Sequence, residues 1–102
     1  MKKTFETLCA QPIGGDGDNP SHILPIYQSA SFDFKTPEQG IEIFKGQVNG
    51  EGYVYSRYGN PTTDAVASKV AMLEAYDIEQ TATGLFCGSG MAAISVLCES
   101  LL

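Results

Sequence analysis

Glycine is concentrated in the first half of the chain, and this limits what that half can fold into. Most of the eleven glycines in the 102 residues stand between Gly14 and Gly59, among many Asp, Asn, Pro and Ser residues. Such segments favour turns and loops, because glycine loses the most backbone entropy on folding and the polar residues suit turns. We therefore do not expect the first half to build a compact core of its own.

Capping residues predict where two early helices begin. Thr4 can cap one or two helical turns over residues 4–10. Thr36 can cap a second helix, with Pro37 at its first position and Gln39 three residues after the cap. Between these helices, residues 25–32 read as an extended segment. The second helix has a narrow apolar face made of Ile41, Phe44 and Val48.

A third helix is predicted to begin at residues 60–64, Asn-Pro-Thr-Thr-Asp, and to end near Tyr76. Its predicted buried face consists of Val66, Val70 and Leu73. Residues 81–87 form an apolar run that can be a buried strand, and residues 88–90, Gly-Ser-Gly, turn the chain into a last helix. The apolar face of that helix consists of Met91, Ile94, Cys98 and Leu101.

The last helix is still apolar and has no stop signal at Leu102. The chain also offers one strand, whereas a parallel sheet needs several strands with helices between them. These two features predict that the chain is truncated.

Composition excludes several classes of function. The net charge of −6 argues against nucleic acid as a partner, since binding to its backbone needs a surplus of Lys and Arg. Three cysteines without a Cys-x-x-Cys pair, and one histidine, argue against a zinc site. No run approaches the roughly 20 apolar residues of a membrane span. We expect a soluble, cytoplasmic protein with no nucleic-acid or membrane partner.

The strand, Gly-Ser-Gly turn and helix start at residues 81–93 form a pattern suited to an anion. Free amides of the first helical turn and the helix dipole favour a negative ligand, and Gly88 and Gly90 let it approach the backbone. The same residues fit the dinucleotide pattern G-x-G-x-x-G/A, while a glycine turn is also often only a turn. A nucleophile elbow is excluded, because Cys87 and Met91 stand where it needs glycines.

A second candidate anion site lies in residues 53–63, which hold Tyr55 and Arg57. Arginine is the best bidentate phosphate ligand, and tyrosine hydroxyls are good neutral donors. At i and i+2, Tyr55 and Arg57 lie on the same side of an extended segment and can hold one anion together. The alternative is a loop before a helix, with Arg57 as a solvated charge.

Taken together, these motifs resemble a known family. Four blocks follow one another in order: residues 23–32, Ile-Leu-Pro-Ile-Tyr-Gln-Ser-Ala-Ser-Phe; residues 55–62, Tyr-Ser-Arg-Tyr-Gly-Asn-Pro-Thr; residues 73–74, Leu-Glu; and residues 89–94, Ser-Gly-Met-Ala-Ala-Ile. This series resembles the Cys/Met-metabolism (transsulfuration) family of pyridoxal 5′-phosphate (PLP) enzymes. Its members include cystathionine synthases and lyases, methionine lyases and O-acylhomoserine sulfhydrylases. The resemblance runs from about Thr4 to Leu102.

The resemblance implies a PLP site shared between subunits. Gly90 and Met91, with Ser89 nearby, would bind the phosphate of their own subunit's cofactor. Tyr55 and Arg57 would reach the phosphate of a neighbouring subunit's cofactor. The implied partners are a small amino-acid substrate and further copies of the chain, as a homotetramer that is a dimer of dimers.

The resemblance also implies an α/β fold of the PLP-dependent transferase-like type, fold type I, with a mostly parallel sheet. Residues 1–60 would be an N-terminal arm lying on a neighbouring subunit, and residues 61–102 would begin the PLP-binding large domain. The chain would then be the N-terminal part of an enzyme that catalyses β/γ elimination or replacement at sulfur amino acids.

The chain departs from the family in its lysines. Lys2, Lys3, Lys35, Lys45 and Lys69 are the five lysines, and none stands in a motif matching the family's Schiff-base lysine. We therefore expect these 102 residues to be inactive alone and assign no catalytic residue or metal ligand. Two alternatives stay open at this point: part of a dinucleotide-binding oxidoreductase, and a standalone binding module.

Overall fold

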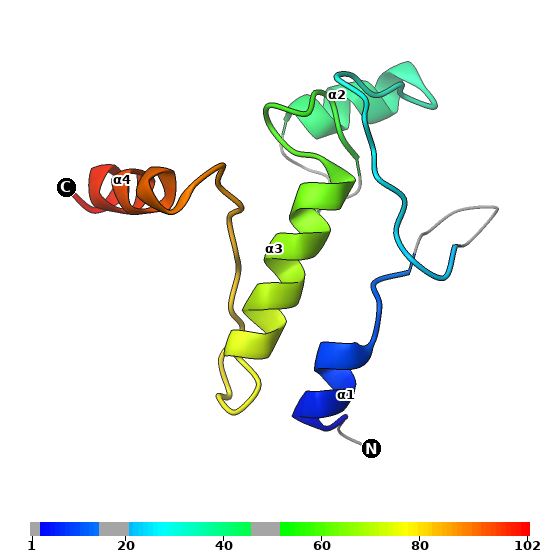
Figure 1. The fold of residues 1–102 in the computed structure, drawn as a ribbon. Coiled ribbons are helices and arrows are strands. Elements are labelled where there is room, and N and C mark those ends of the chain that lie inside the picture. Colours follow the sequence, from blue (N-terminus) through cyan, green and yellow to red (C-terminus); the bar gives the residue numbers. More distant parts are fainter. Residues whose placement is uncertain (1–2, 15–20, 46–51) are drawn as a thin grey trace. The chain divides into compact units, whose positions relative to one another are not determined.

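The structure is a computed structural model that describes residues 3–14, 21–45 and 52–102. Within these ranges it contains four helices, α1 (Phe5–Ala10), α2 (Pro37–Phe44), α3 (Pro61–Glu74) and α4 (Gly90–Leu101), as Figure 1 shows. The chain divides into two compact units, Gly14–Thr63 and Met1–Ile13 with Asp64–Leu102, and each is described by itself.

Helices α1 and α4 each begin with a side-chain cap, of which the sequence analysis predicted Thr4 but not Ser89. The hydroxyl of Thr4 accepts a hydrogen bond from the amide of Thr7 at 3.3 Å. The hydroxyl of Ser89 accepts one from the amide of Ala92 at 3.1 Å. Each cap satisfies one of the amides that the first helical turn leaves without a partner. The predicted starts of both helices are confirmed.

Helix α2 also begins as predicted, with Thr36 as its cap and Pro37 at the first position. The Thr36 hydroxyl accepts from the amide of Gln39 at 3.2 Å. The Gln39 side chain in turn accepts from the amide of Lys35 at 2.7 Å. A capping box would direct this second bond to the amide of the cap residue itself. Here it reaches one residue further and holds the chain that enters α2.

The predicted apolar face of α2 is not buried in the described residues. The side chain of Ile41 is 54% exposed and that of Phe44 is 74% exposed, and Val48 lies outside the described residues. Instead, α2 turns Gly40 toward Phe34: a Cβ atom built on Gly40 would lie 3.0 Å from Phe34 Cδ2. The Phe34 ring also meets the Phe44 ring edge-on at 6.2 Å.

Helix α3 starts at Pro61 as predicted and ends at Glu74, two residues before the predicted end. The prediction of its buried face is wrong at both valines, while Leu73 is half-buried. Val66 and Val70 are 42% and 53% exposed, and the buried side chains are Ala67 and Ala71. The physical reason is a close approach of backbone, because a Cβ atom built on Gly84 would lie 2.6 Å from the carbonyl oxygen of Ala67. Only small side chains leave room for such an approach.

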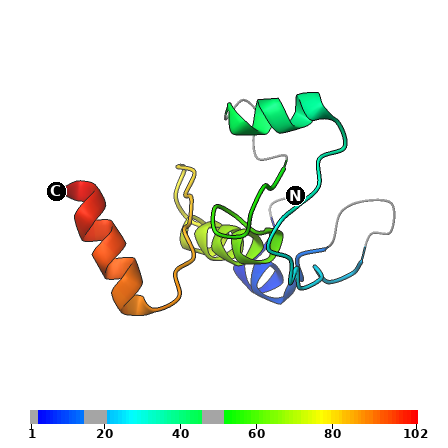
Figure 2. The same ribbon diagram turned by 90° about the horizontal axis from the view of Figure 1, so that it is seen from above.

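Helix α1 lies beside α3, as Figures 1 and 2 agree. The ammonium group of Lys69 on α3 donates hydrogen bonds to the carbonyl oxygens of Leu8 and Gln11, the second at 2.9 Å. These carbonyls lie at the C-terminal end of α1, where a helix has acceptors without intrahelical partners and a partial negative charge. Next to this contact the Phe5 and Tyr76 rings meet edge-on at 5.4 Å.

Residues 81–87 do not form the predicted strand. Leu85 and Phe86 are 76% and 55% exposed. Among the described residues the only β-type pairing is an isolated antiparallel bridge between Ser31 and Tyr55. A strand needs a neighbour for its hydrogen bonds, and the described part of the chain supplies none to residues 81–87.

Helix α4 buries none of its residues. Met91, Ile94 and Leu101 of the predicted apolar face are 70%, 55% and 77% exposed, and Cys98 is exposed as well. No helix in the described ranges is long and apolar enough to cross a membrane.

Candidate functional site

The turn into α4 presents two backbone amides to an anion. Ser89 has an extended backbone, with φ −160° and ψ 161°, and its carbonyl accepts from the amide of Ala93 at 3.1 Å. Its hydroxyl accepts a hydrogen bond from the amide of Ala92. The amides of Gly90 and Met91 precede these and have no acceptor within the helix. They point along the positive end of the helix dipole, where a phosphate is favoured.

The space around this turn agrees with such a ligand. A Cβ atom built on Gly88 or on Gly90 would meet no atom within 4 Å. Neither glycine is therefore required by packing within the described residues. Both leave the backbone open to close approach. The phosphate group of PLP fits this arrangement of free amides, small residues and one hydroxyl.

Tyr55 and Arg57 lie together, but not on an extended segment as predicted. Residues 55–58 form a turn in which the amides of Tyr58 and Gly59 both donate to the carbonyl of Tyr55, at 2.9 and 3.2 Å. This turn brings the Arg57 guanidinium carbon to 5.3 Å from the centre of the Tyr55 ring. A cation at that distance is attracted by the ring's negative face.

A short antiparallel pairing holds the start of this turn. The amide of Phe32 donates to Val54 at 3.1 Å, and the amide of Ser56 donates to Ala30 at 2.9 Å. These bonds flank the bridge between Ser31 and Tyr55. The predicted extended segment at residues 25–32 thus meets the residues just before the turn.

Asn60 joins three parts of this unit, and sequence reasoning predicted only one of its contacts. Its side-chain carbonyl accepts from the amide of Thr62 at 2.9 Å, which confirms the predicted cap of α3. Its side-chain amide donates to the Tyr27 carbonyl and to the Ser56 hydroxyl, both at 3.0 Å. Asn60 is the one buried polar residue of the described chain, at 7% exposed. The asparagine before Pro61 signals a cap, and no sequence signal reveals the other two bonds.

Tyr27 is held at both backbone groups by the start of α3. Its carbonyl accepts from Asn60, and its amide donates to the hydroxyl of Thr62 at 2.9 Å. The Thr62 hydroxyl donates in turn to the carbonyl of Pro25 at 3.3 Å. The residues Asn60, Thr62 and Ser56, with the backbone of residues 25–31, are called the Asn60 network below.

The two groups of residues predicted to bind phosphate lie in different compact units. Tyr55 and Arg57 belong to Gly14–Thr63, and Ser89, Gly90 and Met91 belong to the other unit. Within its own unit, the first group joins a cation to an aromatic ring, and the second lies at a helix N-terminus. That the two groups serve phosphates of different subunits stays a prediction.

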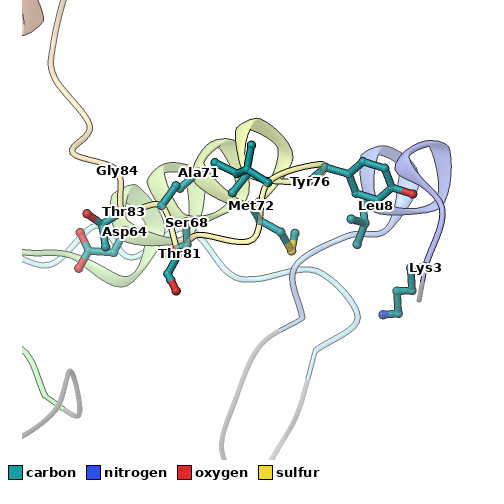
Figure 3. Close-up of a pocket in the computed structure, with 13 residues that line it drawn as sticks. Lys3, Leu8, Asp64, Ser68, Ala71, Met72, Tyr76, Thr81, Thr83 and Gly84 are labelled. Carbon is teal, nitrogen blue, oxygen red and sulfur yellow. The ribbon is translucent and has the colours of Figure 1, made fainter. Parts of the chain in front are cut away.

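A pocket of about 900 Å³ lies along α3, apart from all the predicted cofactor residues. Figure 3 shows Leu8 of α1, Met72 and Tyr76 around its apolar part, and Asp64 with Thr83 at its polar end. Gly84 and Ala71 also line it. No cluster of three or more His, Cys, Asp or Glu residues suited to a metal lies in the described ranges.

Comparison with known proteins identifies the class to which this fold and site belong. The model of the Cys/Met metabolism PLP-dependent enzyme family matches residues 7–102. The chain therefore belongs to that family, as the resemblance of its motifs predicted.

Named relatives include enzymes of two kinds. The chain is 44% identical over 97 residues to an L-methionine gamma-lyase of Porphyromonas gingivalis, covering 93% of this chain and 22% of that protein. It is 33% identical over 104 residues to a homocysteine/cysteine synthase of Saccharomyces cerevisiae, covering 99% of this chain and 22% of that protein. The chain thus spans about a fifth of the length of these relatives. No solved structure matches it.

Proposed function

We propose that these residues are the N-terminal part of a PLP-dependent enzyme of sulfur amino-acid metabolism and that they bind the cofactor's phosphate. The observation that carries the proposal is the start of α4, where two free amides, open glycines and the Ser89 cap form an anion site within the family match. Family membership favours PLP over the dinucleotide alternative. A standalone binding module is disfavoured because the relatives are enzymes about five times as long.

The substrate class follows from the relatives. One is named a methionine gamma-lyase and another a homocysteine/cysteine synthase, so elimination and replacement both occur among proteins similar to this chain. We propose that the whole protein makes or breaks a C–S bond at the β or γ carbon of a cysteine- or homoserine-type amino acid. Cystathionine synthases and lyases and O-acylhomoserine sulfhydrylases carry out reactions of the same class.

Each described residue has a binding role in this proposal. Gly90 and Met91 offer their amides to the phosphate, and Ser89 orders the turn that presents them. Tyr55 and Arg57 contribute a hydroxyl donor and a cation to the phosphate of a neighbouring subunit. When bound, PLP supplies the electron sink for the reaction at the substrate's carbon atoms. No residue described here is assigned a proton-transfer step.

The proposed assembly is a homo-oligomer, a dimer of dimers, in the cytoplasm. Residues 1–60 would lie as an arm on a neighbouring subunit, and residues 61–102 would begin a fold type I domain around a mostly parallel sheet. The high exposure of the apolar residues on α4 and at residues 85–86 supports further packing partners for this part of the chain.

The test compares cofactor retention in the full-length gene product with and without the Arg57 cation. Arg57→Ala is expected to lower the PLP content after gel filtration, and Arg57→Lys to restore it only in part, since lysine lacks the planar bidentate fork. Lys35→Ala removes an exposed cation elsewhere in the same unit and serves as the matched control. Unchanged PLP content in both Arg57 variants would refute the role of Arg57, and saturable NAD binding without PLP binding would refute the proposed function.

A further inference from the structure

The residue between Tyr55 and Arg57 is fixed on three sides. The amide of Ser56 donates to Ala30 at 2.9 Å. Its hydroxyl donates to the carbonyl of Ser29 and accepts from the side-chain amide of Asn60 at 3.0 Å. Tyr55 and Arg57 themselves are exposed. The turn therefore has an anchored centre and two exposed side chains that contact each other, as a preorganised ligand site requires.

Asn60 is the only member of the Asn60 network that contacts all three elements. It reaches the turn through Ser56, the segment before it through Tyr27, which lies 33 residues earlier, and the first turn of α3 through Thr62. Both bonds donated by its amide are part-buried, and an acceptor that is shielded from water costs more than a fully exposed one when it loses its donor. Loss of the amide would remove one of the three bonds that fix Ser56 and one of the two that hold the Tyr27 backbone, and it would leave the cap of α3 in place.

We infer that Asn60 is a positioning residue for phosphate recognition: its side-chain amide sets the Tyr55–Arg57 turn in the orientation that meets the phosphate group. The inference rests on the proposed function and extends it to a residue that itself contacts no cofactor. Asn60 acts through Ser56 on the two side chains that flank it. Asn60 thereby links the start of α3 to the position of the Tyr55–Arg57 turn.

The two functions of Asn60 can be separated by substitution. Asn60→Asp keeps an oxygen for the amide of Thr62, and Asp caps helices about as well as Asn, but it loses both amide donations. Asn60→Ser also keeps a good cap, adds no charge, and is too short to reach Tyr27 and Ser56 together. Both variants lack the side-chain amide, but only Asn60→Asp adds a charge. An effect that both variants show therefore comes from the missing amide and not from the charge.

The readout is the preference of the full-length gene product, freed of cofactor, for pyridoxine 5′-phosphate over pyridoxine. Neither probe has an aldehyde, so neither bonds covalently to lysine. The Kd for pyridoxine divided by the Kd for pyridoxine 5′-phosphate therefore measures the contribution of the phosphate to binding. We expect this ratio to fall roughly tenfold in both Asn60 variants, the size of a typical coupling between contacting residues. The Kd for pyridoxine and the thermal unfolding of α3 should stay close to wild type.

A double variant shows whether Asn60 acts through Arg57. If it does, Asn60→Ser should lower the ratio by clearly less once Arg57→Ala is present, because Tyr55 is then the one phosphate contact left for Asn60 to position. A normal ratio in the Asn60 variants, with a reduced ratio in Arg57→Ala, would overturn the positioning role and leave the proposed function intact. An equal loss of affinity for both probes would overturn it as well, because it would show general damage to the fold. A wild-type protein that does not prefer the phosphorylated probe would overturn both proposals.

Discussion

Gly84 lies so close to α3 that a Cβ atom on it would stand 2.6 Å from the carbonyl oxygen of Ala67 and 3.1 Å from its carbonyl carbon. Backbone atoms of a helix cannot move aside as a flexible side chain can. The contact lies at Ala67, one of the two alanines that α3 buries while its valines stay exposed. It also fixes residues 81–84 along the pocket shown in Figure 3.

The first prediction concerns this contact. Gly84→Ala should lower the free energy of unfolding by about 1 to 3 kcal/mol, the usual cost of forcing one more carbon into a close-packed place. Gly88→Ala is the matched control, because a Cβ atom there meets nothing within 4 Å. Urea unfolding of the cofactor-free full-length gene product measures both. If the two variants had the same free energy of unfolding, the close contact between Gly84 and Ala67 would not contribute to stability.

Lys69 is expected to hold α1 against α3. Lys69→Met keeps most of the apolar stem and removes the donor to Leu8 and Gln11, which should cost about 1 to 2 kcal/mol, as charged hydrogen bonds commonly contribute. The amides of α1 should then exchange with solvent faster in hydrogen-exchange measurements. Lys35→Met, at an exposed lysine, should leave that exchange unchanged. Similar exchange in α1 for both variants would contradict the role of Lys69.

Substitutions at Ser89 should separate helix stability from phosphate binding. Ser89→Ala removes the acceptor for the amide of Ala92 and should destabilise the protein by about 1 kcal/mol. Ser89→Asp keeps the cap and adds a negative charge that the helix dipole favours, so stability should be retained. The same charge should repel a phosphate, and binding of pyridoxine 5′-phosphate should weaken strongly. Tight binding by Ser89→Asp would argue against a phosphate at this turn.

Mixed oligomers test whether Tyr55 and Arg57 serve a neighbouring subunit. Arg57→Ala and Ser89→Asp subunits should each retain little PLP alone. In a mixed dimer with two-fold symmetry, one site combines the intact Ser89 turn of one subunit with the intact Arg57 of the other. Random mixing should therefore restore about a quarter of all sites. If both groups serve their own subunit, mixing restores none, and the PLP content of unfolded and refolded mixtures distinguishes the two arrangements.

Local signals in the sequence predicted the helix starts well. Thr4, Thr36 and Ser89 each accept a hydrogen bond from the amide three residues later, so the relevant contacts lie within a few residues of sequence. The same holds for Asn60 as the cap of α3. The candidate phosphate-binding residues were chosen in the same way, from residue types and spacing, and their role stays a prediction.

Features that depend on distant residues were not predictable. Apolar periodicity indicated Val66 and Val70 as the buried face of α3, whereas Ala67, which Gly84 approaches, and Ala71 are buried there. The strand at residues 81–87 was wrong because apolar composition does not supply a pairing partner. The pairing of Arg57 with Tyr55 was expected from an extended backbone and arises from a turn.

The exposure of α4 has a consequence for the folding of the newly made chain. A helix that shows methionine, isoleucine and leucine side chains to water on several faces resembles the segments that molecular chaperones bind. While these residues stay uncovered, self-association competes with correct folding, and the outcome depends on protein concentration.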